Sequence, residues 1–405
     1  MSIPNPLIKM TTALPKILAE SSDRDLSLRK TKNKNHSNKE SLRILVLNWR
    51  CLRHPQAGGS EINVFEQSSH WTTSGHKVSI FTADPGREYA PDKIEDFVGV
   101  QILRFGGQYT VYLLAALYVL FFSWKYDVIL DVSNGIPFFT PLFTRRPVTL
   151  MIHHVHNQQW FREFSVLPAR IGWFLEKHVV PFLYRNKNVI TVSPTSEEEL
   201  LHIGFKKSQI SIVFSGLSIT VPENVTKPET HRIAYVGRLK AYKRLHLLVE
   251  AVNKLRYEFP RVHLDIAGNG DTLEELRELV KKLDLQAHVT LYGFVTEATK
   301  LEILARANVF ATPSMQEGWG LSVIEANAYG CPAVAYNVPG LSASIPNNET
   351  GFLANTDAEF VEAIAKIFRD EKLSERLSRG AKFWAGMFDW KSSSLSTLSV
   401  MTIGS

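Results

Sequence analysis

Two glutamates bracket a glycine-rich stretch, EGWGLSVIE, in the second half of the chain. Glu317 lies in the loop after an expected strand, and Glu325 lies one turn inside the helix that follows. Between them, Trp319, Gly320 and Leu321 present backbone N–H groups at the start of that helix, which is an anion-binding geometry. Carboxylates do not bind phosphate, so the acids are expected to address hydroxyl groups. A ribose diol suits Glu325 and a sugar ring suits Glu317. The alternative is that both are ordinary helix-flanking charges.

A group of cations follows another expected strand, in the stretch YVGRLKAYKR. The strand ends at Gly237, and Arg238, Lys243 and Arg244 precede or open a helix. Cations at a helix start oppose its dipole, so the fold gives no reason for them. An anionic ligand does, because arginine forks onto phosphate oxygens while lysine adds a mobile charge. A solvated basic loop is the alternative. A ligand that holds diphosphate, ribose and sugar together is a nucleotide sugar.

The first half of the chain offers two further candidates. In HPQAGGSEINVF, Gly58 and Gly59 let a ligand approach the start of the first helix, for which Ser60 is the expected N-cap. A tight strand-to-helix turn also needs glycines, and the GxGxxG spacing is absent. In VTLMIHHVHNQQW a buried strand runs into His153, with other histidines close behind. No carboxylate or cysteine nearby completes a zinc site. One histidine is therefore expected to donate a hydrogen bond in the cleft.

These residues need strand ends to position them, and the sequence supplies strands. Short β-branched runs alternate with amphipathic helical segments, which predicts an α/β fold of two doubly wound, parallel-sheet domains. The runs occupy residues 43–48, 77–83, 101–105, 128–133, 148–153, 189–193 and 211–215, and then 232–238, 263–268, 289–294, 309–314, 333–336 and 351–355. The predicted organisation is a disordered basic leader (1–42), an N-terminal domain (43–215), a linker (216–230), a C-terminal domain (231–385) and a tail (386–405). Ligands of such folds collect at the carboxyl ends of the strands.

The composition of the chain limits its expected cellular location. The chain has 405 residues, a net charge of +6 and two cysteines in different halves, which fits a reducing, cytoplasmic location. The start of the chain lacks the apolar core of a secretion signal. The apolar stretch 111–122 is shorter than the ~20 residues of a spanning helix, so a buried helix is expected. Contact with a membrane surface remains the alternative.

The paired glutamates within EGWGLSVIEANAYGCPAVA, together with GRLKAYKR and GGSE, resemble a family 4 glycosyltransferase of GT-B architecture. The match spans residues 43–390 in order and spacing. The resemblance implies two Rossmann-like domains facing each other across a cleft, and a tail helix that crosses back to the N-terminal domain. It implies that Arg238 and Lys243 hold the donor diphosphate, that Glu325 binds the ribose and that Glu317 faces the transferred sugar.

The resemblance also implies that Gly58 and Gly59 approach the phosphates, and that a cleft histidine aligns with His153, with His154 and His156 as fallbacks. One departure is Ser215-Gly216 in place of the usual Asn-Gly turn before the linker. The implied activity is transfer of a sugar, with retention of configuration, from a nucleotide-diphosphate sugar such as a UDP- or GDP-sugar.

The expected acceptor is a glycan or a lipid-linked molecule in cell-surface polysaccharide or glycolipid synthesis. No metal is expected, because the chain's Asp-x-Asp, Asp23-Arg24-Asp25, lies in the leader. No nucleic-acid partner is expected. A peripheral position on the inner face of a membrane stays open. The alternatives are a sugar-nucleotide epimerase, a glycosyl phosphorylase, or a partner subunit that binds the nucleotide sugar without catalysis.

Overall fold

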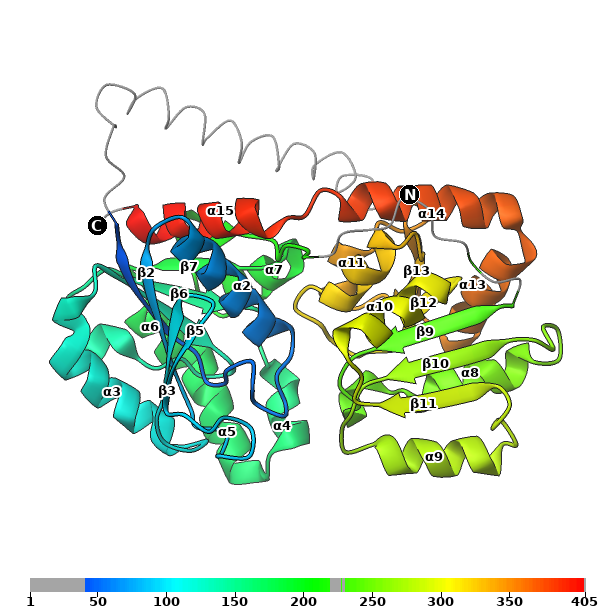
Figure 1. Cartoon of the computed structure of the whole chain (residues 1–405), viewed down its shortest axis with the longest axis horizontal. Helices are drawn as coiled ribbons and strands as arrows, with labels where there is room; N and C mark the ends of the chain where they lie inside the picture. The colour runs from blue at the N-terminus through cyan, green and yellow to red at the C-terminus, as the bar shows by residue number, and fades with distance from the viewer. Residues whose placement is uncertain (1–40, 219–226, 228–229, 404–405) are drawn as a thin grey trace, which may run out of the picture. The chain divides into compact units, whose positions relative to one another are not determined.

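The computed structural model describes residues 41–218, 227 and 230–403 of the chain. The predicted leader up to residue 40, and residues 219–226, 228 and 229 of the predicted linker, lie outside the described residues. The described part contains two α/β lobes. The N-terminal lobe consists of residues 42–218 and the last helix, and the C-terminal lobe consists of residues 230–389 (Figure 1).

Eight described strands form the N-terminal sheet, in the order β3-β4-β2-β1-β5-β6-β7-β8. They are β1 (Arg43–Leu47), β2 (Lys77–Thr82), β3 (Ile94–Phe97), β4 (Val100–Arg104), β5 (Val128–Ser133), β6 (Val148–Ile152), β7 (Asn188–Thr191) and β8 (Ile210–Ile212). All pairings are parallel except that of β3 with β4. The sequence pattern does not predict β3, because this mostly exposed edge strand has no apolar run.

Helices cover both faces of this sheet. Its helices are α2 (Gly59–Thr73), α3 (Thr110–Phe122), α4 (Trp160–Glu163), α5 (Val166–Phe174), the π-helix η4 (Leu175–Val179), α6 (Val180–Leu183) and α7 (Pro194–His202). Short 3-10 turns are η1 (Ser123–Lys125), η2 (Thr140–Leu142), η3 (Asn157–Gln159) and η5 (Lys207–Gln209). Buried residues of α3, α6 and α7 pack on one face, and those of α2 and the last helix, α15 (Trp390–Thr402), pack on the other.

The start of α2 differs from the prediction. Gly58, not Ser60, occupies the N-cap position. Its N–H donates to Glu61 Oε2 at 2.7 Å, and Glu61 Oε1 accepts from Arg50 Nε at 3.1 Å. The Ser60 hydroxyl instead donates to Asn134 Oδ1 at 3.0 Å. Ser60 is thus inside the helix, because the glutamate carboxylate supplies the acceptor that a cap would provide.

The apolar stretch 111–122 forms a helix, but the prediction that it is buried is wrong. In α3 only Val111, Ala115 and Val119 are buried, one turn apart along a single stripe. The opposite side is exposed although it is also apolar. A helix that is apolar all round normally has neighbours on every side. The outer side of α3 is therefore unusual.

Six described strands form the C-terminal sheet, all parallel, in the order β11-β10-β9-β12-β13-β14. They are β9 (Arg232–Val236), β10 (His263–Ala267), β11 (Val289–Gly293), β12 (Val309–Thr312), β13 (Ala333–Tyr336) and β14 (Gly351–Ala354). The lobe's helices are η6 (Ala241–Lys243), α8 (His246–Leu255), α9 (Leu273–Lys282), α10 (Glu297–Arg306), α11 (Leu321–Ala328), α12 (Leu341–Ser344), α13 (Asp357–Arg369) and α14 (Glu371–Ala385).

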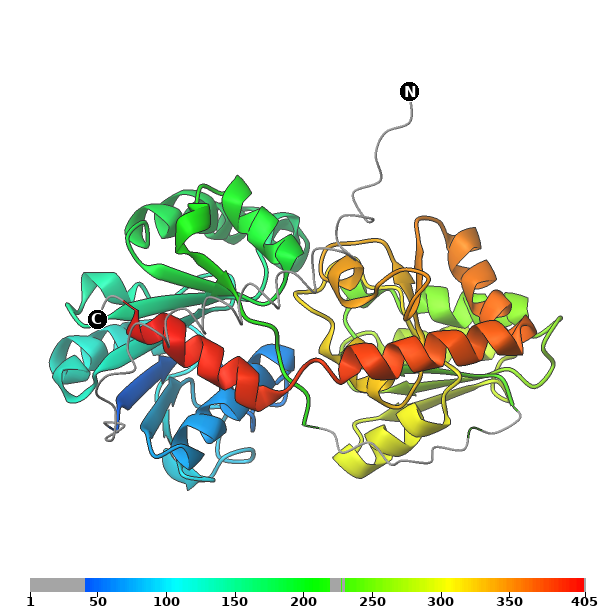
Figure 2. The ribbon, with the colours of Figure 1, turned by 90° about the horizontal axis from the view of Figure 1, so that it is seen from above.

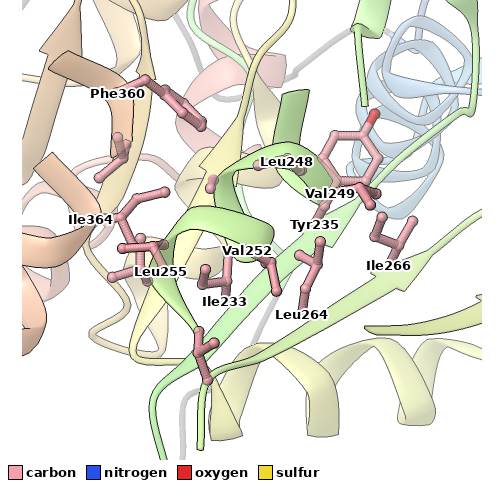
Figure 3. Packing of buried hydrophobic residues seen from close by; sticks show 14 of the residues in the cluster. Ile233, Tyr235, Leu248, Val249, Val252, Leu255, Leu264, Ile266, Phe360 and Ile364 are labelled. Atoms are coloured by element: carbon pink, nitrogen blue, oxygen red, sulfur yellow. The ribbon is translucent and has the colours of Figure 1, made fainter. Parts of the chain in front are cut away.

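The C-terminal core forms because α8 and α13 place apolar residues at helical spacing against strand residues. Figure 3 shows Val249 and Val252 of α8 beside Ile233 and Leu264 of the strands, and each of these side chains is at least 99% buried. Burial of such a side chain contributes roughly 1.5–3 kcal/mol. The packed sheet holds the loops at its strand ends in fixed positions.

The chain passes between the lobes twice, and the two passages touch. The helix α15 packs on the N-terminal lobe, where the Trp71 indole donates to the Ser394 carbonyl at 2.8 Å (Figure 2). A Cβ built on Gly216 would lie 2.2 Å from the backbone nitrogen of Trp390. Residue 216 must therefore be glycine, since any side chain would collide with the tail. The Ser215 hydroxyl accepts from Asn63 Nδ2 at 2.7 Å.

Candidate functional site

A cavity of about 510 Å³ lies where the strands of both lobes end. Loops after β1, β5 and β6 line it from the N-terminal lobe, and loops after β9, β10 and β12 line it from the C-terminal lobe. With the exception of Arg244, the residues proposed for the site from the sequence line this cavity: Gly58, Gly59, His153, Arg238, Lys243, Glu317, Trp319, Gly320, Leu321 and Glu325. Their placement agrees with the rule that ligands collect at the carboxyl ends of parallel strands.

A buried ion pair lies at the centre of the cavity wall. The Lys243 ammonium donates to Glu317 Oε1, and the two side chains are only 10% and 20% exposed. Burial by itself lowers the pKa of Lys243, but the adjacent Glu317 carboxylate, together with Tyr242 and Tyr235, raises the pKa above its ordinary value. Lys243 therefore carries its charge at physiological pH. A lysine has three donors, so Lys243 can bind Glu317 and an incoming anion together.

A second ion pair joins Glu325 of α11 to Lys300 of α10. Glu325 Oε1 accepts from Lys300 Nζ at 2.9 Å, and the same ammonium lies 2.7 Å from Glu297 Oε1. Burial raises the pKa of Glu325, while Lys300 opposes the rise. Lys300 was not predicted from the sequence. It belongs to an amphipathic helix and has a glutamate three positions before it, which is typical of an ordinary surface lysine.

The cationic side chains that follow β9 point in different directions in the structure. The Arg238 guanidinium faces the N-terminal lobe, and a Cβ built on Gly58 would lie 3.5 Å from Arg238 Nε. The expectation that Arg244 joins the same anion site is wrong. Its Nε donates to the Pro313 carbonyl at 2.8 Å, and its guanidinium lies 4.3 Å from the centre of the Tyr336 ring. A left-handed backbone at Arg244, with φ of 51°, directs the side chain away from the cavity.

The helix α11 begins between the glutamates of the two ion pairs in the sequence. Gly320 is its N-cap with φ of 78°, a left-handed conformation that favours glycine. The first N–H groups of a helix lack an acceptor four residues earlier, and Leu321 and Ser322 of the first turn line the cavity, so this helix start favours an anion there. The Trp319 ring packs against Phe214 and Phe388, with ring centres 4.9 and 5.1 Å apart. Trp319 thus anchors the loop by its side chain.

All three histidines after β6 line the cavity, but their surroundings differ. The rings of His154 and His156 stack with centres 4.6 Å apart, and His156 Nδ1 lies 3.5 Å from Glu176 Oε1. Both ring nitrogens of His153 are buried, and neither has a hydrogen-bond partner among the described residues. A buried polar group without a partner is costly unless a ligand satisfies it. His153 is therefore the histidine best suited to meet a ligand.

Burial lowers the pKa of His153 from an ordinary 6.5 to about 4. The unfolded chain takes up this proton near pH 6.5 and the folded chain near pH 4, so the contribution of His153 to stability is lost as the pH falls through this window. Between pH 7.5 and 5 the free energy of unfolding should fall by about 2 kcal/mol more in the unsubstituted protein than in His153→Gln. Denaturant unfolding at both pH values measures this, with exposed His202→Gln as the control. Equal losses in all three proteins would contradict it.

Polar contacts tie the lobes together beside the cavity. Gln316 Nε2 donates to the Val155 carbonyl at 2.9 Å and to Glu199 Oε1 at 3.2 Å. The Gly340 N–H donates to Thr195 Oγ1 at 2.9 Å. Burial raises the pKa of Glu199 to about 6. These residues could not be predicted from the sequence, since nothing in one lobe's local pattern marks a partner in the other.

Two kinds of feature are absent from the described residues. They contain no group of three or more histidine, cysteine, aspartate or glutamate side chains arranged to hold a metal ion. Among the helices within the described ranges, none has the length and apolar character needed to cross a membrane.

Two family models match the chain and together span both lobes. Residues 57–220 match the model described as Glycosyltransferase Family 4, and residues 220–384 match the model described as Glycosyl transferases group 1. The boundary between the two matches falls in the passage between the lobes.

Individual proteins are similar over most of the chain. The alpha-1,3/1,6-mannosyltransferase ALG2 of Homo sapiens is 29% identical over 366 residues, which cover 79% of this chain and 87% of that protein. The phosphatidylinositol N-acetylglucosaminyltransferase gpi3 subunit of Schizosaccharomyces pombe is 23% identical over 78% of this chain and 71% of that protein. The crystal structure of Anabaena Alr3699/HepE in complex with UDP and glucose superposes with a TM-score of 0.72. It covers 89% of this chain and 100% of that one, at 18% identity.

Proposed function

The chain belongs to the family 4, group 1 glycosyltransferases of GT-B fold, and from this premise we propose that it moves a sugar from a nucleotide-diphosphate sugar to a glycan or lipid-linked acceptor. One observation carries the proposal. A single cavity is lined by two largely buried lysine–glutamate pairs, and the two glutamates flank the start of α11 in the sequence. Such a wall offers positive charge to a diphosphate and carboxylates to hydroxyl groups.

The proposed donor arrangement follows from this wall. The diphosphate meets Lys243, the first N–H groups of α11, and Arg238, with Gly58 and Gly59 leaving room on the N-terminal side. The ribose diol donates to Glu325, which Lys300 holds in place. The transferred sugar lies at Glu317 and within reach of His153, whose ring nitrogens have no hydrogen-bond partner in the described part of the chain. In this arrangement the negative diphosphate meets cations and N–H donors, and the ribose and sugar hydroxyl groups meet carboxylates.

The proposed reaction retains configuration at the transferred sugar. The bond between the sugar C1 and the phosphate oxygen breaks, and a bond from C1 to the acceptor hydroxyl oxygen forms on the same face. The acceptor proton goes to the departing phosphate oxygen. Lys243, Arg238 and the α11 amides stabilise the charge that grows on the nucleoside diphosphate. These groups are fixed before the reaction, so they need little rearrangement during it.

This electrostatic account predicts that transfer does not depend on a divalent metal. Activity in EDTA should stay within about twofold of activity in magnesium, because protein cations already face the leaving group. Initial rates after chelation and dialysis measure this. If EDTA abolished transfer and magnesium restored it, the main cation would be missing from the proposed mechanism.

The second lysine should act on donor binding. In Lys300→Met, Glu325 loses the cation that holds its side chain in place and favours its ionised form. The donor Kd should therefore rise by about 10- to 100-fold. The turnover number at saturating donor should change less, since the ribose lies away from the bond that breaks. Titration calorimetry and steady-state kinetics separate the two effects. Lys281→Met, at an exposed position on α9, is the matched control. An unchanged Kd in Lys300→Met would reject the role of this pair.

The acceptor is proposed from the relatives. The names of two of them specify a mannosyltransferase and a phosphatidylinositol N-acetylglucosaminyltransferase subunit. The latter name contains a lipid acceptor, which supports a lipid-linked acceptor and glycolipid synthesis at a membrane surface for this chain.

A two-step experiment tests the function. Thermal unfolding with UDP-, GDP- and ADP-sugars identifies the donor as the nucleotide sugar that raises Tm in the unsubstituted protein but not in Lys243→Met. The labelled donor is then incubated with and without a lipid-linked or glycan acceptor. Label in the acceptor supports the transferase. Isomerised donor, sugar phosphate formed only with inorganic phosphate, or binding without turnover would instead indicate one of the alternative functions.

A further inference from the structure

The outer side of α3 presents a continuous apolar surface. Leu113, Leu117, Leu120 and Phe121 are exposed, at spacings of three or four residues that place them on one side of the helix. Leu113 and Phe121 are 65% and 62% exposed. No acid or base occurs between residues 107 and 124. A surface helix in water normally carries polar residues on its outer side.

A second helix adds to the same side of the lobe. The segment from α5 through η4 to α6 exposes Leu167, Ile171, Phe174 and Phe182, again along one stripe. α3 and α6 contribute Val119 and Val180 to one core cluster on one face of the sheet (Figure 1). The outer sides of α3 and of α5–α6 are therefore on the same side of the N-terminal lobe. We call these exposed residues the apolar face.

Cations accompany the apolar face. The ammonium groups of Lys125 and Lys177 lie 4.8 and 4.7 Å from the ring centres of Phe122 and Trp173. The Arg185 guanidinium lies 4.8 Å from the ring of Phe182. The acid within residues 166–183, Glu176, is buried and accepts from backbone and indole donors instead of facing outward. Apolar side chains with cations beside them match a surface of acyl chains and negative headgroups.

The apolar face also continues toward the cavity. Phe161 and Phe164 are exposed on and after α4, which directly follows the cavity residues His156 and Gln159. Trp160 fixes this connection, because a Cβ on Gly172 of α5 would lie 2.5 Å from its ring. Only a few residues of the chain thus separate the apolar face from the cavity lining.

We propose that the apolar face docks the N-terminal lobe onto a lipid bilayer that contains anionic lipids. The exposed leucine and phenylalanine side chains enter the acyl region, and Lys125, Lys177 and Arg185 remain at the headgroups. The proposal concerns a surface outside the cavity and does not require the transfer reaction. Together with the proposed function, it places an acceptor that is anchored in the bilayer next to the site.

The test is flotation of the full chain with vesicles of phosphatidylcholine alone and with vesicles that also contain phosphatidylglycerol. The chain should bind the anionic vesicles preferentially. The double substitution Leu113→Gln/Phe121→Gln should weaken binding by at least about tenfold, because two exposed apolar groups no longer leave water. Lys177→Gln/Arg185→Gln should weaken binding to anionic vesicles by about tenfold or more and remove the preference for them. Phe383→Gln, at a 76% exposed phenylalanine on α14 of the other lobe, should bind normally.

Tm shifts with the identified nucleotide sugar should be the same in all these variants, which separates docking from the function of the cavity. The proposal is overturned if the full chain does not bind either type of vesicle, or if Phe383→Gln weakens binding as much as the α3 variant. It is also overturned if the α3 substitutions only dissociate a dimer in sedimentation analysis without changing vesicle binding, since the occupant would then be a second copy of the chain.

Discussion

Lys243→Met is expected to reduce sugar transfer by roughly a thousandfold or more, the largest effect of any substitution proposed for this chain. In the proposed donor arrangement Lys243 is the buried cation that meets the diphosphate, and the adjacent Glu317 favours its charged form. Methionine has a similar shape but supplies no charge for the leaving group. Steady-state rates with the identified donor, and its Kd from calorimetry, measure the loss.

Loss of stability must be separated from loss of catalysis in this variant. Removing one partner of a buried ion pair leaves the other charge uncompensated, which costs about 3–5 kcal/mol. The double substitution Lys243→Met/Glu317→Gln leaves no such charge, so it should recover most of the stability while transfer stays well below that of Glu317→Gln alone. If the double variant transferred sugar as fast as Glu317→Gln, Lys243 would have a structural role only.

Glu317→Gln is expected to lower kcat by about a hundredfold while binding of the nucleoside diphosphate stays the same or becomes tighter. A charged carboxylate is a stronger acceptor for sugar hydroxyl groups than an amide, and loss of one such contact in the transition state costs about 2.7–4 kcal/mol in comparable cases. The substitution also releases Lys243 from its carboxylate partner, so the lysine can address phosphate alone. Rate measurements at saturating donor and calorimetry with the sugar-free nucleotide distinguish these effects.

Glu302→Gln provides the matched control, because Glu302 is exposed on α10 within the same lobe. It should leave both kcat and nucleotide binding unchanged. A fall in nucleotide affinity that parallels the fall in kcat in Glu317→Gln would mean that the carboxylate supports the phosphate site and does not face the sugar.

Both predictions rest on the same feature of the cavity wall. Buried ion pairs are weak evidence for stability, because desolvation of the two charges offsets most of their attraction. The fold could pack apolar residues at these positions instead. Two such pairs around the start of α11 are therefore better explained by a ligand that needs fixed charges of both signs.

The sequence alone determined the two α/β lobes and placed most of the candidate site residues at the ends of strands. Strand periodicity predicted where most strands lie, and the strands bring their ends to one edge of each sheet. For that reason Arg238, Lys243, Glu317 and Glu325 line one cavity, as expected from their positions after strands. Local rules suffice here because each residue follows its own strand directly.

Only the tertiary structure decided what each side chain contacts. Lys300 looks like a surface lysine in the sequence, and Arg244 looks like a cavity residue, yet packing exchanges their roles. The exposure of α3 could not be read from its composition, since an apolar helix has the same sequence pattern whether or not a neighbour covers it. The collision that requires Gly216 involves a residue far along the chain. These features depend on which distant elements meet, and local periodicity carries no information about that.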